Sequence, residues 1–162
     1  MTSRPMSVLI ISTPVGPVGS GLGGGVELTI RNIAQGLERL GHRIEVVAPT
    51  GSISVGSATH RIDGDLEPSV QFVERSAPIN EPRREAVLTK MWSYVREHAA
   101  EYDVILNMAY DALPFRDGPA LSVPVAHLVS MGSLTDAMDS VIDGLLVARP
   151  STVAMHSRAQ AS

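Results

Sequence analysis

A glycine-rich stretch, TPVGPVGSGLGGGVE at residues 13–27, lies between an apolar run and a segment with helical periodicity. Its last glycines, Gly23, Gly24 and Gly25, stand directly before that segment. The N-terminus of a helix offers unpaired N–H groups and a partial positive charge, and residues without side chains let an anion come close. The sequence therefore predicts phosphate binding at Gly24 and Gly25. The alternative is a surface loop in which the glycines only form turns.

The same stretch contains a literal G-x-G-x-x-G pattern, from Gly19 to Gly24, which is typical of dinucleotide-binding domains. Two features of its context argue against a nicotinamide or flavin site. Residues 13–18 separate the pattern from the preceding strand, and no acidic residue ends the next strand, Arg43–Ala48, to hold a ribose. An NAD-dependent oxidoreductase is therefore the less favoured alternative.

Other candidate ligand contacts closely follow two predicted strands. They are Tyr110, Asp111, Ser130 and Met131. The carboxyl ends of strands in a doubly wound sheet border a ligand crevice, so these residues are predicted to line it. Tyr110 has a flat ring that can stack on a flat ligand, and Asp111 can accept hydrogen bonds from ligand N–H groups. The alternative for Asp111 is a cap of a short helix.

Two more titratable residues are candidates for ligand contact. Glu27 falls in the first turn of a predicted helix, where an acidic side chain either faces the crevice or is simply favoured by the helix dipole. His127 lies inside the apolar strand VPVAHLV, where a histidine is either a ligand contact or a buried structural residue.

A metal site is not predicted. The chain has no cysteine and no H-x-x-x-H pattern. Its D-x-D pattern, Asp63 and Asp65, lies in a Gly- and Ser-rich segment away from the predicted strand ends, which favours a solvated turn over a cation site. The residues also assign no catalytic group.

The elements that position these residues alternate between strand and helix. Apolar runs predict strands at Ser7–Ser12, Arg43–Ala48, Val70–Glu74, Asp103–Met108, Val123–Val129 and Thr152–Met155, with a short edge strand near 61–63. Helical spacing predicts helices at Val26–Leu40 (ended by Gly41), at Glu81–Ala100, and from Ser133 or Thr135 to Leu146. Residues 110–118 are a loop or short helix, and another helix begins at 157–160. The prediction is one doubly wound α/β domain over 1–162, with a mainly parallel, Rossmann-like sheet.

The composition excludes two functional classes. The 162 residues carry a formal net charge of −4 and no basic run, which argues against nucleic-acid binding. No segment approaches the roughly 20 apolar residues of a membrane span, and the N-terminal apolar run is too short for a signal peptide. These features predict a cytoplasmic protein.

Several motifs, in order, resemble the N-terminal domain of GT-B glycosyltransferases of family 4. Residues 24–27 match the family's G-G-x-E loop, and residues 37–44 match its L-x-x-x-G-H-x-V run, with Ile44 in place of the valine. Residues 103–105 and 124–125 fit the later pattern, so the resemblance covers essentially the whole chain. The family's T-x-H pattern is not matched, because its place falls near Ser130.

This resemblance implies one of two Rossmann-like domains in a retaining, metal-independent glycosyltransferase. Such an enzyme would need no cofactor, and the UDP-sugar would be a co-substrate. Gly24 and Gly25 would contact the donor diphosphate. The acceptor-side residues would be Glu27, Tyr110, Asp111, His127, Ser130 and Met131. The C-terminal, donor-binding domain would be absent from this chain, which alone would be inactive. The alternative is a non-catalytic ligand-binding module or subunit that works with a separate donor-domain chain.

A narrower resemblance concerns four segments. STPVGP at 12–17, GGGVELT at 23–29, ILNMAYD at 105–111 and AHLVSMGS at 126–133 are similar to cyanobacterial glucosyltransferases that transfer glucose from UDP-glucose to tetrahydrobiopterin. It implies glucose as the sugar and a reduced pterin as the small-molecule acceptor.

Overall fold

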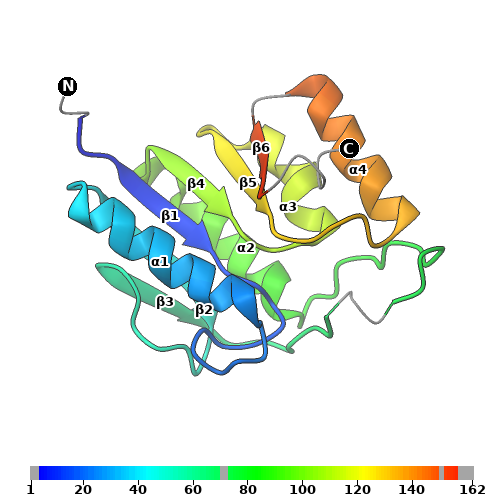
Figure 1. The fold of residues 1–162 in the computed structure, drawn as a ribbon, viewed down its shortest axis with the longest axis horizontal. Coiled ribbons are helices and arrows are strands. Elements are labelled where there is room, and N and C mark those ends of the chain that lie inside the picture. Colours follow the sequence, from blue (N-terminus) through cyan, green and yellow to red (C-terminus); the bar gives the residue numbers. More distant parts are fainter. Residues whose placement is uncertain (1–3, 70–72, 150–151, 157–162) are drawn as a thin grey trace.

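A six-stranded parallel sheet with strand order β3-β2-β1-β4-β5-β6 forms the centre of the domain (Figure 1). The computed structural model describes residues 4–69, 73–149 and 152–156. The strands are β1 (Ser7–Ile11), β2 (Arg43–Pro49), β3 (Ala58–Ile62), β4 (Val104–Asn107), β5 (Val125–Val129) and β6 (Val153–Met155). Strand order reverses between β1 and β4, which confirms the predicted doubly wound, Rossmann-like topology and places the ligand crevice at the carboxyl ends of these two strands.

Helices cover both faces of the sheet. They are α1 (Gly25–Arg39), α2 (Val87–His98), α3 (Ala112–Asp117) and α4 (Asp136–Ala148), with 3-10 turns at Ala99–Glu101 and Gly118–Ala120. On β1, Val8 and Ile10 pack with α1, whereas Leu9 and Ile11 pack with α2. Val129 of β5 packs with α3 and α4. The alternation along β1 explains why its sequence is apolar throughout. None of the described helices is long and apolar enough to cross a membrane.

The second predicted helix begins later than expected, at Val87 instead of Glu81. Residues before it pair with a distant segment. The Asp65 N–H donates to the Glu85 carbonyl, and the Val87 N–H donates to the Asp65 carbonyl. A Cβ on Gly64 would lie 2.6 Å from the Val87 Cα, so this close approach requires glycine. The backbone groups that would begin a longer helix are used in this bridge.

One other expectation needs correction, and another lies outside the described residues. Of the strand predicted at 70–74, residues 70–72 lie outside the described residues, and Val73 and Glu74 are not in a strand. The helix expected at 157–160 also lies outside them. Leu28 and Leu40, which share the helical spacing of the α1 core residues, are exposed, because Ile30 and Ala34 occupy the side that faces the sheet.

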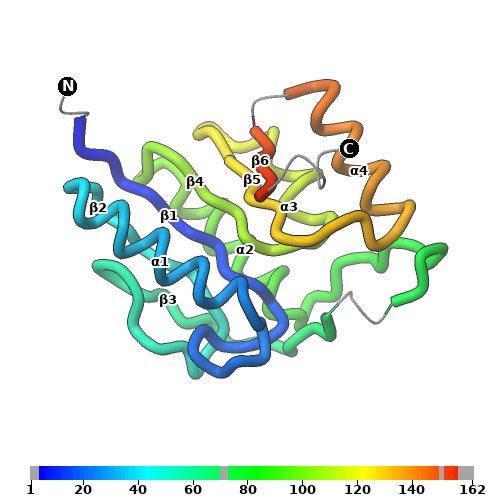
Figure 2. Tube along the Cα trace, in the orientation of Figure 1, coloured from blue at the N-terminus to red at the C-terminus, as the bar shows by residue number. Residues whose placement is uncertain are grey.

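The predicted helix ends are confirmed where local chemistry defines them. Gly41, with φ +89°, follows α1, and its N–H donates to the Glu38 carbonyl. Thr135 caps α4, since its hydroxyl accepts from the Met138 N–H at 3.2 Å. Figure 2 shows the β1–α1 loop beside the first part of the connection that leads from β3 to α2, where the Glu67 N–H donates to the Pro14 carbonyl.

Candidate functional site

The glycine-rich loop that leaves β1 is tied to its neighbours by hydrogen bonds. Val18 is fully buried; its N–H donates to the Ser52 hydroxyl at 2.9 Å, and its carbonyl accepts from the Ile53 N–H at 2.9 Å. The Pro14 carbonyl accepts from the Glu67 N–H at 3.0 Å. The loop is therefore joined both to the turn after β2 and to the connection that leads to α2.

Glu27 does not point into an open crevice. Its residue is 5% exposed, and its carboxylate is enclosed by the loop. One oxygen, Oε2, accepts from the N–H groups of Gly19 at 2.6 Å and Gly21 at 3.1 Å, and Oε1 accepts from the Gly23 N–H at 2.6 Å. The Ser20 hydroxyl donates to Oε1 at 3.3 Å. Burial opposes ionisation, but these hydrogen bonds outweigh it and lower the pKa of Glu27.

Gly24 and Gly25 lie beside this carboxylate-bound segment, at the start of α1. A Cβ on either residue would meet nothing within 4 Å, so the space next to both is open. Gly24 has φ +59° and no side chain caps the helix. Within the described residues, the N–H groups of Gly25 and Val26 have no hydrogen-bond partner. This arrangement suits an anion, although the contact with a diphosphate stays a prediction.

A cavity of about 550 Å³, here called the Glu67 cavity, opens at the same end of the sheet. It lies between the segment 67–89, the start of α3 and the start of α4. Its lining includes Glu67, Arg83, Leu88, Tyr110, Asp111 and Met138. Glu67 Oε2 is buried and has no hydrogen-bond partner among the described residues. The cavity therefore has both apolar and charged residues in its lining and an unused acceptor in its wall.

The charge of Asp111 acts on Glu67 in this cavity. Burial raises the pKa of Asp111, and the hydrogen bond from the Leu113 N–H, at 2.9 Å, only partly offsets this. Burial also raises the pKa of Glu67; the charge of Asp111 raises it further, and Arg83 lowers it. Ligand groups that donate hydrogen bonds or carry positive charge would relieve this repulsion. Asp111 also caps α3, so the capping alternative is confirmed.

Tyr110 separates the Glu67 cavity from a second one of about 340 Å³, here called the Arg75 cavity. The Tyr110 hydroxyl oxygen is buried, and no group of the described residues forms a hydrogen bond of acceptable geometry with it. Burial raises the pKa of Tyr110, and the nearby charge of Asp139 adds to the effect, while the adjacent Leu134 N–H opposes it. A hydroxyl in this state can still bind a ligand group.

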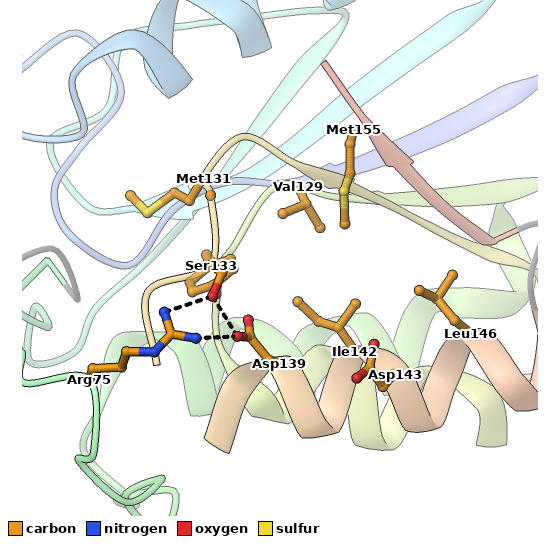
Figure 3. Close-up of a pocket in the computed structure, with 11 residues that line it drawn as sticks. Arg75, Val129, Met131, Ser133, Asp139, Ile142, Asp143, Leu146 and Met155 are labelled. Carbon is orange, nitrogen blue, oxygen red and sulfur yellow. Dashed lines mark hydrogen bonds and ion pairs between the residues drawn. The ribbon is translucent and has the colours of Figure 1, made fainter. Parts of the chain in front are cut away.

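The Arg75 cavity combines a polar end with an apolar floor (Figure 3). Arg75 donates to the Ser133 hydroxyl at 3.0 Å and lies 3.4 Å from the Asp139 carboxylate, and Ser133 donates to the same carboxylate at 2.5 Å. The apolar floor is formed by side chains from β5, α4 and β6, namely Val129, Ile142, Leu146 and Met155. Met131 lies at the edge of this cavity, where the sequence predicted a crevice residue.

His127 and Ser130 are not among the residues that line the Glu67 cavity or the Arg75 cavity. The His127 ring is 1% exposed and stacks on Phe115, with ring centroids 4.4 Å apart. Its Nδ1 accepts from the Asn107 side-chain amide at 3.1 Å. The Ser130 hydroxyl bonds His156 Nε2 at 3.2 Å. These contacts favour the buried structural alternative for His127, and acceptor contact by either residue stays a prediction.

Sequence reasoning missed Glu67 and Arg75. Both lie in the long connection between β3 and α2, on either side of the strand predicted at 70–74, and neither belongs to a motif. Glu27 carried a signal: three glycines at alternate positions, 19, 21 and 23, precede it at a distance that lets a carboxylate reach back to their N–H groups. Within the described residues no group of histidine and acidic side chains is arranged to hold a metal ion, and Asp63 and Asp65 are exposed.

Comparison with known proteins gives the family. The model of the Glycosyltransferase Family 4 domain matches residues 23–129, about two thirds of the chain. The match includes Gly24, Gly25, Glu67, Tyr110 and Asp111. No curated protein matches the chain. Domains of this kind bind a sugar nucleotide and an acceptor, and the parallel Rossmann-like sheet agrees with one domain of a GT-B fold. The chain belongs to glycosyltransferase family 4.

Proposed function

We propose that this chain supplies the acceptor side of a retaining glycosyltransferase that moves glucose from UDP-glucose to a small acceptor of the reduced-pterin class, such as tetrahydrobiopterin. The Glu67 cavity is the observation that carries the proposal. Its volume of about 550 Å³ is within the range of small-molecule sites. It lies at the carboxyl ends of the strands, where ligands bind in folds of this class.

The polar groups of this cavity suit a flat molecule with several N–H donors. A pterin carries an amino group next to a ring N–H, and these two donors match the free Oε2 of Glu67 and the carboxylate of Asp111. Tyr110 contributes an aromatic ring and a hydroxyl without a full hydrogen bond. A ligand that donates to both carboxylates would compensate the burial that raises the pKa of each and the charge of Asp111 that raises the pKa of Glu67 further.

The donor would approach from the side of the glycine loop. Its diphosphate would lie on the open N–H groups that begin α1, next to Gly24 and Gly25. In the transfer step the bond from sugar C1 to the diphosphate oxygen breaks and its electron pair stays on the diphosphate. An acceptor hydroxyl oxygen forms the new bond to C1 on the same face, and its proton passes to the leaving diphosphate. Fixed N–H dipoles stabilise the charge that develops there.

A donor-binding domain would complete the cleft, either in the same protein or on a separate chain. In the second case this chain would be a binding subunit, and in both cases it would not transfer glucose by itself. An assay with UDP-glucose and tetrahydrobiopterin, performed with this chain alone and with a donor-binding domain added, distinguishes these arrangements. Transfer by the chain alone would contradict the proposed division of roles.

Acceptor binding is tested directly by NMR titration of the chain with tetrahydrobiopterin. We expect shifts in the backbone amides around Tyr110 and Asp111, and an affinity about tenfold lower in Glu67→Gln and in Asp111→Asn, since one charge-assisted hydrogen bond contributes on the order of 1.5–3 kcal/mol. Glu97→Gln, which removes an exposed carboxylate from α2, is the matched control and should bind as the wild type does. Equal affinity in all four proteins would refute this site.

A further inference from the structure

The carboxylate of Glu27 fills a nest of backbone N–H groups that otherwise suits a phosphate. Three N–H groups, from Gly19, Gly21 and Gly23, converge on it at 2.6–3.1 Å. Successive N–H groups in a turn form an anion-binding concavity. Here the anion is a side chain of the protein itself, so these three donors are occupied before any ligand arrives.

The backbone of the loop is built for this contact. Gly19 and Gly21 have φ values of +95° and +84°, which side chains disfavour. A Cβ on Gly23 would lie 3.0 Å from the Glu27 Oε1 and 2.8 Å from the Thr13 methyl carbon. The loop therefore closes over the carboxylate only with glycine at these places.

The donors next to the nest are left open. Gly24 and Gly25 follow the nest directly, and no described group covers either residue. If Glu27 were absent, the three N–H groups of the nest would lose their acceptor. The loop would then lose the hydrogen bonds that hold residues 19–23 together. The position of Gly24 at the start of α1 depends on those hydrogen bonds, because the Gly24 N–H donates to the Gly21 carbonyl at 3.2 Å.

We propose that Glu27 is a positioning residue: it holds the loop 19–23 from within and so presents the N–H groups that begin α1, rather than those of the nest, to the diphosphate of the donor. This inference rests on the proposed function and assigns Glu27 a role other than acceptor contact. It also predicts that a donor phosphate does not enter the nest. The lowered pKa of Glu27 keeps the carboxylate ionised at neutral pH, as the role requires.

Hydrogen exchange of individual backbone amides, measured by NMR on this chain, tests whether Glu27 holds the loop 19–23. In Glu27→Gln one carboxylate oxygen becomes an NH2 group that faces N–H donors, so we expect exchange at Gly19, Gly21 or Gly23 to accelerate at least tenfold. Glu38→Gln removes the same charge from an exposed position on the same helix and should leave these rates unchanged. Thermal melting of each variant shows whether the whole domain has been affected. Wild-type exchange rates in a folded Glu27→Gln chain would overturn the proposal.

NMR titration with UDP-glucose tests whether the N–H groups that begin α1, rather than those of the nest, face the donor diphosphate. We expect amide shifts at Gly24, Gly25 and Val26 in the wild type, little change within the nest, and at least tenfold weaker binding in Glu27→Gln. Shifts concentrated at Gly19, Gly21 and Gly23 would overturn the proposal, because they would mean that phosphate displaces Glu27. Faster exchange with unchanged donor affinity would refute the positioning role alone. Absence of any shift in the wild type would refute the donor site of the proposed function and, with it, the orientation toward a donor.

Discussion

Protonation of His127 is predicted to destabilise this fold as the pH falls from 7 to 4. The ring is buried against Phe115, and its Nδ1 accepts a hydrogen bond from the Asn107 amide. The orientation of that amide is fixed, since Asn107 also donates to the Ala109 carbonyl at 2.9 Å and accepts from the Ala109 N–H at 3.1 Å. A proton on Nδ1 would therefore face an NH2 group that cannot turn away without breaking both bonds.

The size of the effect follows from the pKa of His127, which burial lowers from 6.5 to about 4. Between these two values the unfolded chain binds one proton more than the folded chain, so the free energy of unfolding rises with pH. The contribution is fully present above about pH 6.5 and falls by about 1.4 kcal/mol per pH unit until about pH 4. The total loss is about 3 kcal/mol, which is a large part of the 5–15 kcal/mol that stabilises a typical domain.

Urea unfolding of the wild type and of His127→Gln at pH 7, 6, 5 and 4 measures this directly. All other titratable groups are shared, so the difference between the two pH profiles isolates His127. The wild type should lose about 3 kcal/mol more than the variant over this range. His127→Phe, which keeps an aromatic ring against Phe115, provides a second non-titrating variant. His98→Gln removes a partly exposed histidine and should lose as much free energy of unfolding between pH 7 and pH 4 as the wild type does. Parallel profiles for the wild type and both His127 variants would refute the assignment.

Two further predictions concern stability and can be measured by urea unfolding at neutral pH. Gly64→Ala should destabilise the domain by about 1–3 kcal/mol, because the new Cβ would lie 2.6 Å from the Val87 Cα in a backbone bridge that cannot move freely. Its control is Gly36→Ala in α1, where a Cβ meets nothing within 4 Å, and this change should stabilise the domain by about 0.5–1 kcal/mol. A Gly64→Ala chain with the free energy of unfolding of the wild type would show that the close approach does not require glycine. Thr135→Ala should cost about 1 kcal/mol by removing the cap on the Met138 N–H, whereas Thr135→Ser should restore most of it, and equal losses in both variants would contradict a capping role.

The sequence could predict the sheet because its strands are read locally. β1, β2, β4 and β5 are short, mainly apolar runs, and burial by α1 and α2, with α3 and α4 over β5, explains that composition. The start of α2 could not be predicted in this way. Its first turn is displaced by a pairing with Asp65, more than 20 residues earlier, and only Gly64 permits it. Local periodicity carries no information about a contact of that kind.

The same distinction applies to the site. Tyr110, Asp111 and Met131 follow strands directly, so topology alone directs them to the crevice, and each lines a cavity. Glu67 reaches the same place from an irregular connection, held by a hydrogen bond between its backbone N–H and the Pro14 carbonyl. The role of His127 depended on Asn107 and Phe115, which stand on neighbouring elements, so its own strand could not decide between the two alternatives.

The G-x-G-x-x-G pattern of the β1–α1 loop has a physical explanation that differs from dinucleotide binding. Gly19 and Gly21 adopt backbone angles that favour glycine, and with Gly23 they direct their N–H groups at an internal carboxylate. A bound pyrophosphate would need those donors, yet Glu27 already holds them. In this chain the spacing of the glycines is thus set by the side chain four residues beyond Gly23. The open N–H groups lie one step further along, where the loop becomes α1, which is where we propose that the donor diphosphate binds.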